Sequence, residues 1–403
     1  MLSVRSRVFI SAAILMGIAA FLPISASLAA PPPEETSDLR DGKAFTIPFT
    51  LSRGHIYVSV KVNGKPATFG LDTDAYTNVL TPEAAKRLGI DASETGKSTT
   101  AVGVGGVQKS WIVPIDSLTI GGASLTNSQI FVLGLPKSAK LDGLLGYQFL
   151  CNFVTSIDYQ AKTVTFSAAS SPKTGDVVLE LKPTRGVPVV DVDIDGVRGR
   201  FQVDTGDGGS IEIVAKFAER NHLADKYPRH IDLVTGLGVG GSVRSSVVRL
   251  KTLKLGTAVL NNVAGNLSLQ KTGVFAAGYF DGVIGYGILS RFKITLDYQA
   301  ARVILTDAGI KNKPFDYNRS GVGFDVAGDG LHVTEIIPGG PGEQAGVIVG
   351  DEIVELNGSP VGETEFDRVT AAAQGAPGEK MRLKLRAADK AERDVTLTLR
   401  ELI

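Results

Sequence analysis

Cysteine is almost absent from this sequence, which has one such residue among 403. A single thiol excludes a framework of intrachain disulfides. Cys151 lies in the apolar stretch 149–153, so we expect a buried, unreactive side chain rather than a nucleophile. Histidine is scarce as well, and its four copies lack the spacing of metal ligands, so we expect no metal site. They are His55, His222, His230 and His332.

An excess of charge of either sign is also missing. Lysine plus arginine and aspartate plus glutamate both number 42, so the formal net charge is zero. A chain without a basic field has no general electrostatic attraction for nucleic acid. We therefore expect no nucleic-acid partner.

An apolar run long enough for a membrane span is not found at the N-terminus. Residues 8–22 are apolar, but this run is shorter than the roughly 20 residues that cross a bilayer. Arg5 and Arg7 precede it, and the small residues Ser27 and Ala29 follow it. This layout is typical of a secretory signal peptide cleaved before Ala30. It predicts export to the periplasm and no stable membrane span after cleavage.

Two ligand-binding motifs occur only in part. Residues 191–196 open like a calcium loop, but Gln202 stands at the twelfth position and the neighbouring residues alternate as in a strand. Three glycines between 236 and 241 have the spacing of a dinucleotide-binding loop, yet a strand-like stretch follows them instead of a helix. The sequence therefore predicts no cofactor.

Glycine is abundant, with 47 residues, and many segments alternate valine and threonine with polar residues. These features favour a turn-rich, mainly β protein. An internal repeat is more informative, because Asp72-Thr73 and Asp204-Thr205 follow a tight-turn pair at the same spacing. Four further landmarks recur in the same order, and the chain therefore contains a duplicated lobe. They are Gly103–Gly106 with Gly238–Gly241, Leu118–Gly121 with Leu253–Gly256, Asp142–Gly146 with Asp281–Gly285, and Ile157–Ala161 with Leu296–Ala300.

Local signals place each aspartate at the end of a strand. Asn63-Gly64 and Asp195-Gly196 tolerate the positive φ of a tight hairpin turn. A short helix is predicted after each aspartate, over 82–88 with Thr81 as N-cap, and over 213–223 in the second copy. The serine-rich residues 167–175 read as a linker between the lobes, and 310–314 as a second linker.

This duplicated Asp-Thr arrangement resembles the aspartic proteases of the retropepsin and pepsin group. The resemblance implies a two-lobed β-barrel fold with Asp72 and Asp204 as the catalytic pair, acting on a polypeptide substrate. One carboxylate would accept a proton from water while the other, protonated, polarises the peptide carbonyl. By the same resemblance the supporting residues are Thr73, Thr205 and Gly206, with the triplets 144–146 and 283–285 packed beneath.

Glycine-rich hairpins close over the substrate in this family. Residues 99–113 and 234–248 match these flaps, and both copies keep the glycine element, so we expect two flaps. The flap glycines are Gly103, Gly105, Gly106, Gly238, Gly240 and Gly241.

One residue departs from the family pattern, since Asp74 stands where the family has glycine. A carboxylate facing the catalytic pair would raise its pKa values, whereas one facing solvent would leave the chemistry intact. Two functions follow. The first is an aspartic endopeptidase, and the alternative is an inactive peptide-binding adaptor that keeps the protease fold.

The sequence changes character after the second linker. The motifs Gly321–Phe324, Gly339–Gly346 and Gly350–Gly358 resemble a bacterial PDZ domain. The resemblance implies an α+β domain in which Val322, Gly323 and Phe324 bind a C-terminal or internal peptide segment beside a helix over 363–374. Substrate tethering and regulation both remain open as its role.

The predicted division of the chain follows from these landmarks. It comprises a signal peptide (1–29), an N-terminal extension (30–43), lobe 1 (44–168), lobe 2 (176–307) and a PDZ domain (315–403).

Overall fold

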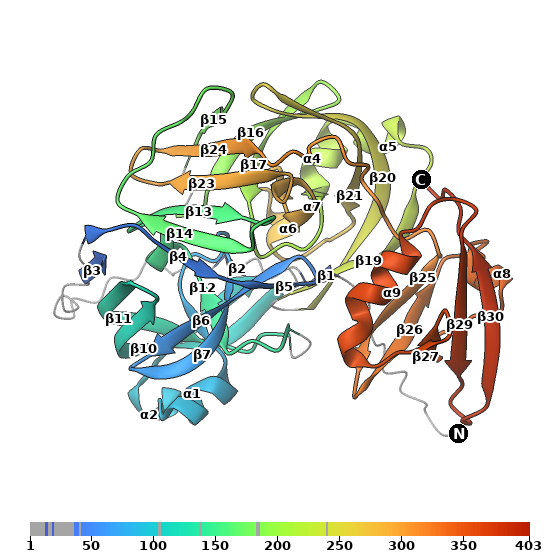
Figure 1. Cartoon of the computed structure of the whole chain (residues 1–403), viewed down its shortest axis with the longest axis horizontal. Coiled ribbons are helices and arrows are strands. Elements are labelled where there is room, and N and C mark those ends of the chain that lie inside the picture. The colour runs from blue at the N-terminus through green and yellow to red at the C-terminus, as the bar shows by residue number, and fades with distance from the viewer. Residues whose placement is uncertain are drawn as a thin grey trace.

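The computed structural model describes residues 13–14, 18–19, 36–39, 42–103, 106–136, 139–182, 186–238 and 241–403. Most of the predicted signal peptide and extension therefore lies outside the described residues. The protein is mainly β, with two lobes side by side and a smaller domain at one flank (Figure 1). This confirms the predicted fold class.

Lobe 1 is built on a ten-stranded sheet, in the order β2-β9-β10-β11-β8-β12-β7-β6-β5 with β3 paired to β11. An additional pairing between β10 and β6 curls the sheet towards a barrel. The strands are β2 (Ile18–Ala19), β3 (Thr36–Leu39), β5 (Thr50–Ser52), β6 (His55–Val62), β7 (Lys65–Leu71), β8 (Val79–Leu80), β9 (Lys97–Gly103), β10 (Gly106–Ile120), β11 (Ala123–Val132) and β12 (Gly143–Leu145).

Lobe 2 repeats this plan in an eight-stranded sheet, in the order β1-β19-β20-β16-β17-β22-β18-β21. Its hairpin β16–β17 corresponds to β6–β7 of lobe 1, and β22 corresponds to β12. The strands are β1 (Ala13–Ile14), β16 (Val189–Ile194), β17 (Val197–Val203), β18 (Ile211–Ile213), β19 (Ile231–Gly238), β20 (Gly241–Leu255), β21 (Ala258–Ser268) and β22 (Gly282–Ile284).

A six-stranded sheet joins the two lobes, and it takes three strands from each. Its central pair is β13 with β23, in which Thr155 lies opposite Leu296. The order is β15 (Val177–Glu180), β24 (Arg302–Asp307), β23 (Phe292–Asp297), β13 (Val154–Asp158), β14 (Thr163–Ser167) and β4 (Phe45–Pro48). One continuous core of buried apolar side chains extends through both lobes.

The turn and helix signals of the sequence are mostly confirmed. Asn63 and Asp195 have φ values of 48° and 49°, as the hairpin turns require. Helix α1 (Pro82–Leu88) begins after the N-cap Thr81, whose side chain accepts a hydrogen bond from the Ala84 N–H. The second helix was predicted too early, because 211–213 form β18 and α4 begins only at Ala215.

The remaining helices of the lobes are short, with four to six residues each. They are α2 (Ala92–Thr95), α3 (Tyr147–Leu150), α4 (Ala215–Arg220, slightly longer), α5 (Leu223–Lys226), α6 (Val274–Ala277) and α7 (Tyr286–Leu289). Cys151 follows α3 and is partly exposed, so the expectation of a buried thiol was wrong in degree. Among the described residues, no helix is long and apolar enough to cross a bilayer.

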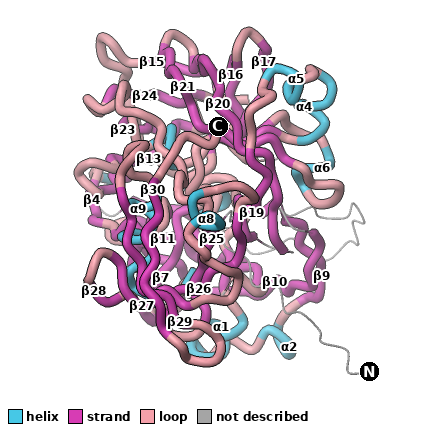
Figure 2. Tube along the Cα trace, turned by 90° about the vertical axis from the view of Figure 1, so that its right-hand side faces the viewer, coloured by secondary structure: helices cyan, strands magenta, loops and turns pink. Residues whose placement is uncertain are grey.

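The C-terminal domain has its own sheet (Figure 2). It also has its own apolar core. The sheet order is β25-β26-β27-β29-β30, with β28 paired to β27, so β25 is an edge strand. Its elements are β25 (Val322–Ala327), β26 (Gly330–Ile336), α8 (Pro341–Gln344), β27 (Glu352–Leu356), β28 (Ser359–Pro360), a 3-10 turn (Glu363–Glu365), α9 (Phe366–Ala373), β29 (Lys380–Arg386) and β30 (Glu392–Thr398). The helix predicted over 363–374 is thus a 3-10 turn followed by α9.

Candidate active site

Two equivalent loops meet between the lobes, each at the end of a strand. β7 pairs in parallel with β12, and the Asp72 N–H donates to the Leu145 carbonyl over 3.0 Å. β17 pairs with β22 in the same way, and the Asp204 N–H donates to the Ile284 carbonyl over 3.0 Å. The apolar triplets therefore lie beneath the loops and fix where each aspartate leaves its strand.

The two loops hold each other through their threonines. Thr73 Oγ1 donates to the Val203 carbonyl (2.5 Å), and Thr205 Oγ1 donates to the Leu71 carbonyl (2.8 Å). Each hydroxyl also accepts the backbone N–H of the opposite threonine, over 3.1 Å in both directions. Both threonines are fully buried. This reciprocal network fixes the spacing of the neighbouring aspartates.

The structure brings the carboxyl groups of Asp72 and Asp204 into one buried site. Asp72 Oδ1 accepts two backbone N–H groups, from Asp74 (3.0 Å) and Ala75 (2.9 Å). Asp204 Oδ1 accepts the Gly206 N–H (2.6 Å). The Oδ2 atoms of both aspartates are buried, and no donor within the described part of the chain reaches them. These two oxygens are the ones free to share a proton or hold a water molecule.

Gly206 allows this close approach. A Cβ atom at that position would lie 2.6 Å from the carboxyl carbon of Asp72, a distance that real Cβ contacts do not show. The absence of a side chain at Gly206 thus lets the second loop pack against the carboxyl group of the first.

Burial is the main cause of the raised pKa values of the two catalytic aspartates. It raises the pKa of Asp72 to about 8, the negative charge of Asp74 adds to the rise, and the N–H donors of Ala75 and Asp74 oppose it. Burial also raises the pKa of Asp204 well above its usual value, and the charges of Asp72 and Asp207 act in the same direction. Two neighbouring carboxyl groups with raised pKa values retain a shared proton near neutral pH.

Asp74 lies inside this site. The residue is only 4% exposed, so the alternative that it faces solvent was wrong. Its Oδ1 atom is buried and has no donor in the described ranges. Burial, followed by the charges of Asp204 and Asp207, raises its pKa well above the usual value. Asp74 is therefore a third carboxyl group beside the pair.

Two further buried acids were missed by the sequence reasoning. Burial raises the pKa of Asp207 to about 6, against the opposing Gly209 N–H. Burial also raises the pKa of Glu212 to about 8, although the Ser245 hydroxyl donates to it over 2.6 Å. Asp207 could have been found by aligning the two loops, because Ala75 stands at its place in lobe 1. The sequence signal for Glu212 was weaker, because it is a single acidic residue between the two isoleucines of β18.

The predicted flaps are two hairpins, β9–β10 and β19–β20. Gly103 pairs with Gly106 at one tip, and Gly238 pairs with Gly241 at the other. Gly105 and Gly240 lie outside the described residues. Residues 18–19 pair with β9, and residues 13–14 pair with β19. The flap strands can therefore accept an extended segment of polypeptide by backbone pairing.

Comparison with protein families agrees with this geometry. Residues 58–149 and 190–288 match the model of an aspartyl protease family, and residues 332–387 match a PDZ domain. The two lobes belong to the aspartyl protease family, and the C-terminal domain is a PDZ domain. The resemblance stated from the sequence is thereby confirmed.

Solved structures match as well. One is the crystal structure of a retropepsin-like aspartic protease from Rickettsia conorii, which is 25% identical and covers 33% of this chain and 94% of that chain, with a TM-score of 0.25. A comparison with curated proteins gave no match.

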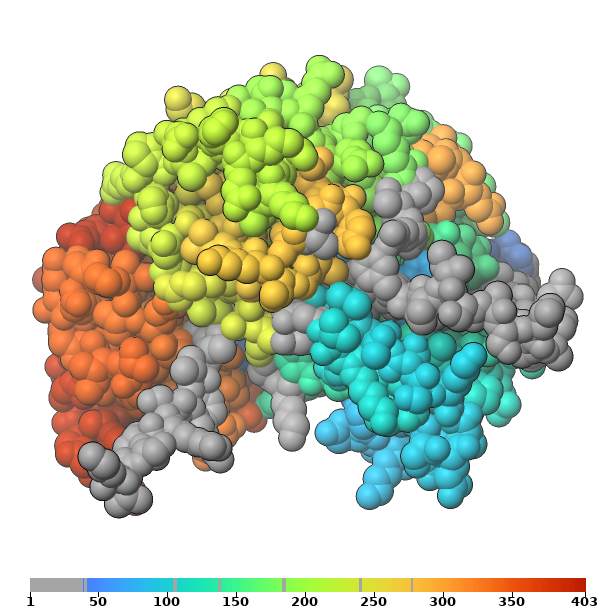
Figure 3. Space-filling model, turned by 180° about the vertical axis from the view of Figure 1, so that it is seen from behind, coloured from blue at the N-terminus to red at the C-terminus, as the bar shows by residue number. Residues whose placement is uncertain are grey.

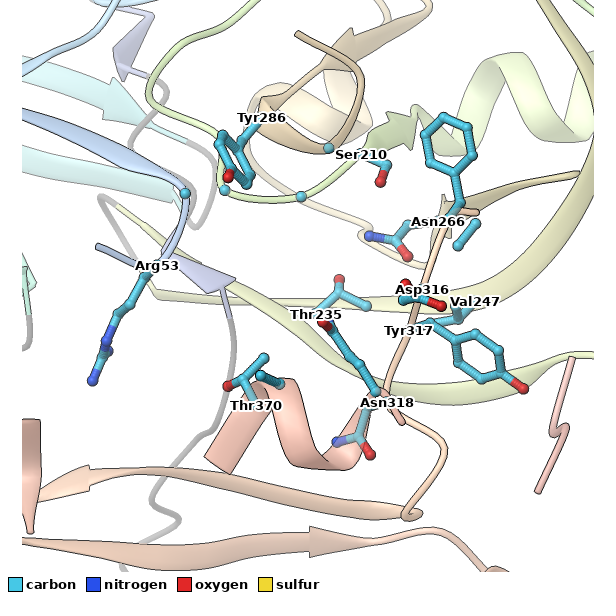
Figure 4. Close-up of a pocket in the computed structure, with 18 of the residues that line it drawn as sticks. Arg53, Ser210, Thr235, Val247, Asn266, Tyr286, Asp316, Tyr317, Asn318 and Thr370 are labelled. Carbon is cyan, nitrogen blue, oxygen red and sulfur yellow. The ribbon is translucent and has the colours of Figure 1, made fainter. Parts of the chain in front are cut away.

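The PDZ residues predicted to bind peptide lie at the start of the edge strand β25. Val322 and Phe324 are both buried, and Gly323 and Phe324 line a cavity of about 570 Å³. The cavity is bounded by the PDZ domain, by the β5–β6 turn of lobe 1 and by the β19–β20 flap of lobe 2 (Figure 4). The residues predicted to bind peptide therefore face a cavity that the PDZ domain shares with the two lobes.

Proposed function

We propose that this chain is an aspartic endopeptidase that hydrolyses peptide bonds in exported polypeptides, with a PDZ domain that binds a C-terminal or internal segment of a substrate or effector. The observation that carries the proposal is the pair of buried Oδ2 atoms on Asp72 and Asp204, for which the described chain supplies no donor.

The mechanism assigns different roles to the two aspartates. Asp72 accepts two backbone N–H groups, which stabilise its ionised form, whereas the charge of Asp72 adds to the raised pKa of Asp204. Asp72 is thus the base that takes a proton from water as its oxygen attacks the peptide carbonyl carbon. Asp204 is the acid that gives its proton to the carbonyl oxygen. Collapse of the tetrahedral intermediate then breaks the carbon–nitrogen bond, and the amine leaves with a proton from the pair.

The substrate in this proposal is an extended polypeptide. Support comes from the flap strands β9 and β19, which pair with the short segments 18–19 and 13–14. Backbone pairing of this kind recognises an extended chain largely regardless of its side chains. The flaps would close over the bound segment and exclude water from the carboxyl pair.

The test is hydrolysis of denatured casein by the purified protein between about pH 4 and 9, the range set by the raised pKa values. Asp72→Asn and Asp204→Asn should each lower turnover by at least about a thousandfold, because each removes one partner of the pair. Asp191→Asn is the matched control, since that exposed carboxylate lies on β16 away from the site and pairs with Lys182. Turnover that persists unchanged in both site variants would contradict the assignment.

Asp74 favours a second candidate function, a peptide-binding adaptor without catalytic activity. A third buried carboxyl group disfavours the singly ionised pair that hydrolysis needs. Casein binding without turnover, in the native chain and in Asp74→Gly alike, would select this candidate.

Export to the periplasm is the location we propose, on the basis of the N-terminal sequence alone. Recovery of a mature form that begins at Ala30 from the periplasmic fraction of a bacterial host is the expected result. An intact N-terminus on soluble cytoplasmic protein would argue against export.

A further inference from the structure

The PDZ groove lies between the edge strand β25 and helix α9. Phe324 on β25 and Phe366 on α9 form its two walls at one end, with ring centroids 5.4 Å apart. Gly323 on the strand side and Thr370 on the helix side line the cavity that continues this groove. A polypeptide that added a strand to β25 would have to lie along this path.

The protease supplies a side chain to this groove. Arg53 stands at the tip of the β5–β6 turn, with a φ of 52°. Its guanidinium carbon lies 3.9 Å from the centre of the Phe366 ring, and its Nη1 atom is 3.3 Å from Asp325 Oδ1 on β25. The side chains of Arg53 and Asp325 are only 7% and 10% exposed. Arg53 therefore contacts both walls of the groove and excludes water from it.

The backbone of the same turn is also fixed to the helix. The Arg53 N–H and the Ser52 hydroxyl both donate to the carboxylate of Asp367 on α9, each over 3.1 Å. An arginine stacked on an aromatic ring, paired with one acid and held by a second, has the features of a bound ligand.

The other side of the turn packs against the catalytic loop of lobe 2. A Cβ atom on Gly208 would lie 2.3 Å from the Arg53 carbonyl oxygen, and one on Gly54 would lie 2.7 Å from the Gly208 Cα. His55, which is buried, also bonds the Arg53 carbonyl through Nδ1 over 2.8 Å. The backbone of the β5–β6 turn is in direct contact with the backbone at Gly208, so the turn cannot shift without moving Gly208. This glycine lies four residues after Asp204.

We propose that the β5–β6 turn is an internal ligand of the PDZ groove, and that the carboxyl terminus of a second polypeptide must displace Arg53 in order to bind there. Displacement moves the turn relative to Gly208 and so changes the catalytic rate. The competition between Arg53 and a peptide for the groove is argued from the contacts with the PDZ domain alone. The effect on the catalytic rate rests on the proposed proteolytic function.

A second contact keeps the PDZ domain attached when Arg53 leaves. Glu335 on β26 accepts the Val234 N–H of the flap strand β19 over 2.9 Å and pairs with Arg244 on β20 over 2.8 Å. This contact lies beside an irregularity in the pairing of β19 with β20, between Val234 and Gly236. It involves β26 rather than β25 or α9, the two walls of the groove, although Val234 also lines the cavity. Figure 3 shows the PDZ domain packed against lobe 2 on this face. The groove can therefore open while the domain stays docked.

The binding test uses the full chain with Asp204→Asn, so that bound peptides are not cleaved. A phage library that displays random heptapeptides with free C-termini is selected against this protein with native Arg53, with Arg53→Ala, and with Lys140→Ala. Lys140 pairs with Glu363 over 2.9 Å between exposed side chains, so it links lobe 1 to the PDZ domain without entering the groove.

Peptides should bind the Arg53→Ala protein about tenfold more tightly than the native or Lys140→Ala proteins, because removing an internal competitor raises the fraction of open groove. Arg53→Lys, which keeps the charge but loses the planar stacking, should give an intermediate affinity. Equal affinity for all proteins, or failure of every protein to select peptides, overturns the proposal. If Arg53→Ala is unfolded by circular dichroism, the ranking of native and Arg53→Lys decides the outcome.

The rate test uses the same peptides with the catalytic aspartates intact. A selected peptide should change the turnover of casein at least about threefold in the native protein, and it should have no effect on Arg53→Ala, in which the groove is already open. Peptide binding with an unchanged rate would refute the coupling to Gly208. Absence of turnover under all conditions would instead refute the proteolytic function and leave the competition result unaffected.

Discussion

Asp74 stands where the aspartic protease family has glycine, and replacing it with asparagine gives a direct test of the electrostatics of the site. Asparagine has nearly the same shape but carries no charge. Asp74 is buried, and its negative charge is the second cause, after burial, of the raised pKa of Asp72. Asp74→Asn removes that charge, so the pKa values of the catalytic pair should fall.

The magnitude follows from the repulsion between two nearby charges in partly wet protein. Two charges roughly 7 Å apart, at an effective dielectric constant of about 20 to 40, repel by about 1 to 2 kcal/mol. This energy corresponds to about one pKa unit. An amide N–H of asparagine that donated to the pair would act in the same direction, because it would stabilise the ionised form.

The assay is the dependence of kcat/KM on pH, measured with a quenched fluorescent peptide. The rate rises as the first proton leaves the pair and falls as the second is lost, so both limbs should move towards acid, by up to about one unit, in Asp74→Asn. The alkaline limb should move more, since the raised pKa of Asp74 means that its charge is present mainly at higher pH.

Glu212→Gln is the matched control for this experiment. It also removes a buried carboxyl group, but the charge that acts on Glu212 is that of Asp207 and not those of the catalytic pair. Its profile should keep the native limbs. An Asp74→Asn profile that stays in place, or moves towards alkaline pH, would refute our account of the site.

Two substitutions, Glu212→Gln again and Thr73→Val, test stability. Glu212 is buried, and its pKa is raised from 4.5 to about 8. The stability that its protonated form contributes is therefore fully present below about pH 4.5 and is lost as the pH rises through 8. In Glu212→Gln the free energy of unfolding, measured by urea titration, should therefore increase by up to about 4 kcal/mol at pH 8 but by less than about 1 kcal/mol at pH 5. An equal increase at both pH values would contradict the raised pKa of Glu212. Thr73→Val leaves the Val203 carbonyl and the Thr205 N–H unpaired in the core and should lower the free energy of unfolding by about 2 to 3 kcal/mol, whereas Thr73→Ser, which keeps the hydroxyl, should lose less than about 1 kcal/mol.

The sequence predicted the fold well because its strongest signals were repeated. A strand, a tight turn and an Asp-Thr pair at matched spacing occur twice, and the same residues also specify their own local structure. Thr81 and Pro82, for example, define the start of α1 without help from distant residues. Such short-range signals can be read without knowing the tertiary structure.

Signals that depend on distant residues were not readable. Ile213 was predicted as the first residue of a helix, but the pairing of β18 with β21 and β22 makes it a strand residue. Nothing near Arg53 in the sequence indicates that it meets Asp325, which is 272 positions away. The direction in which Asp74 points likewise depends on how the two lobes pack. Tertiary contacts decided each of these cases.

The six-stranded sheet that joins the lobes has a consequence for how the protein behaves on dilution. Because β13 of one lobe pairs with β23 of the other within a single chain, the two halves stay together at any protein concentration. The specific rate should therefore be constant down to picomolar enzyme, whereas a site assembled from two separate chains would lose its partner. The same tether lets each half change independently, so one loop could acquire Asp74 while the other kept Gly206.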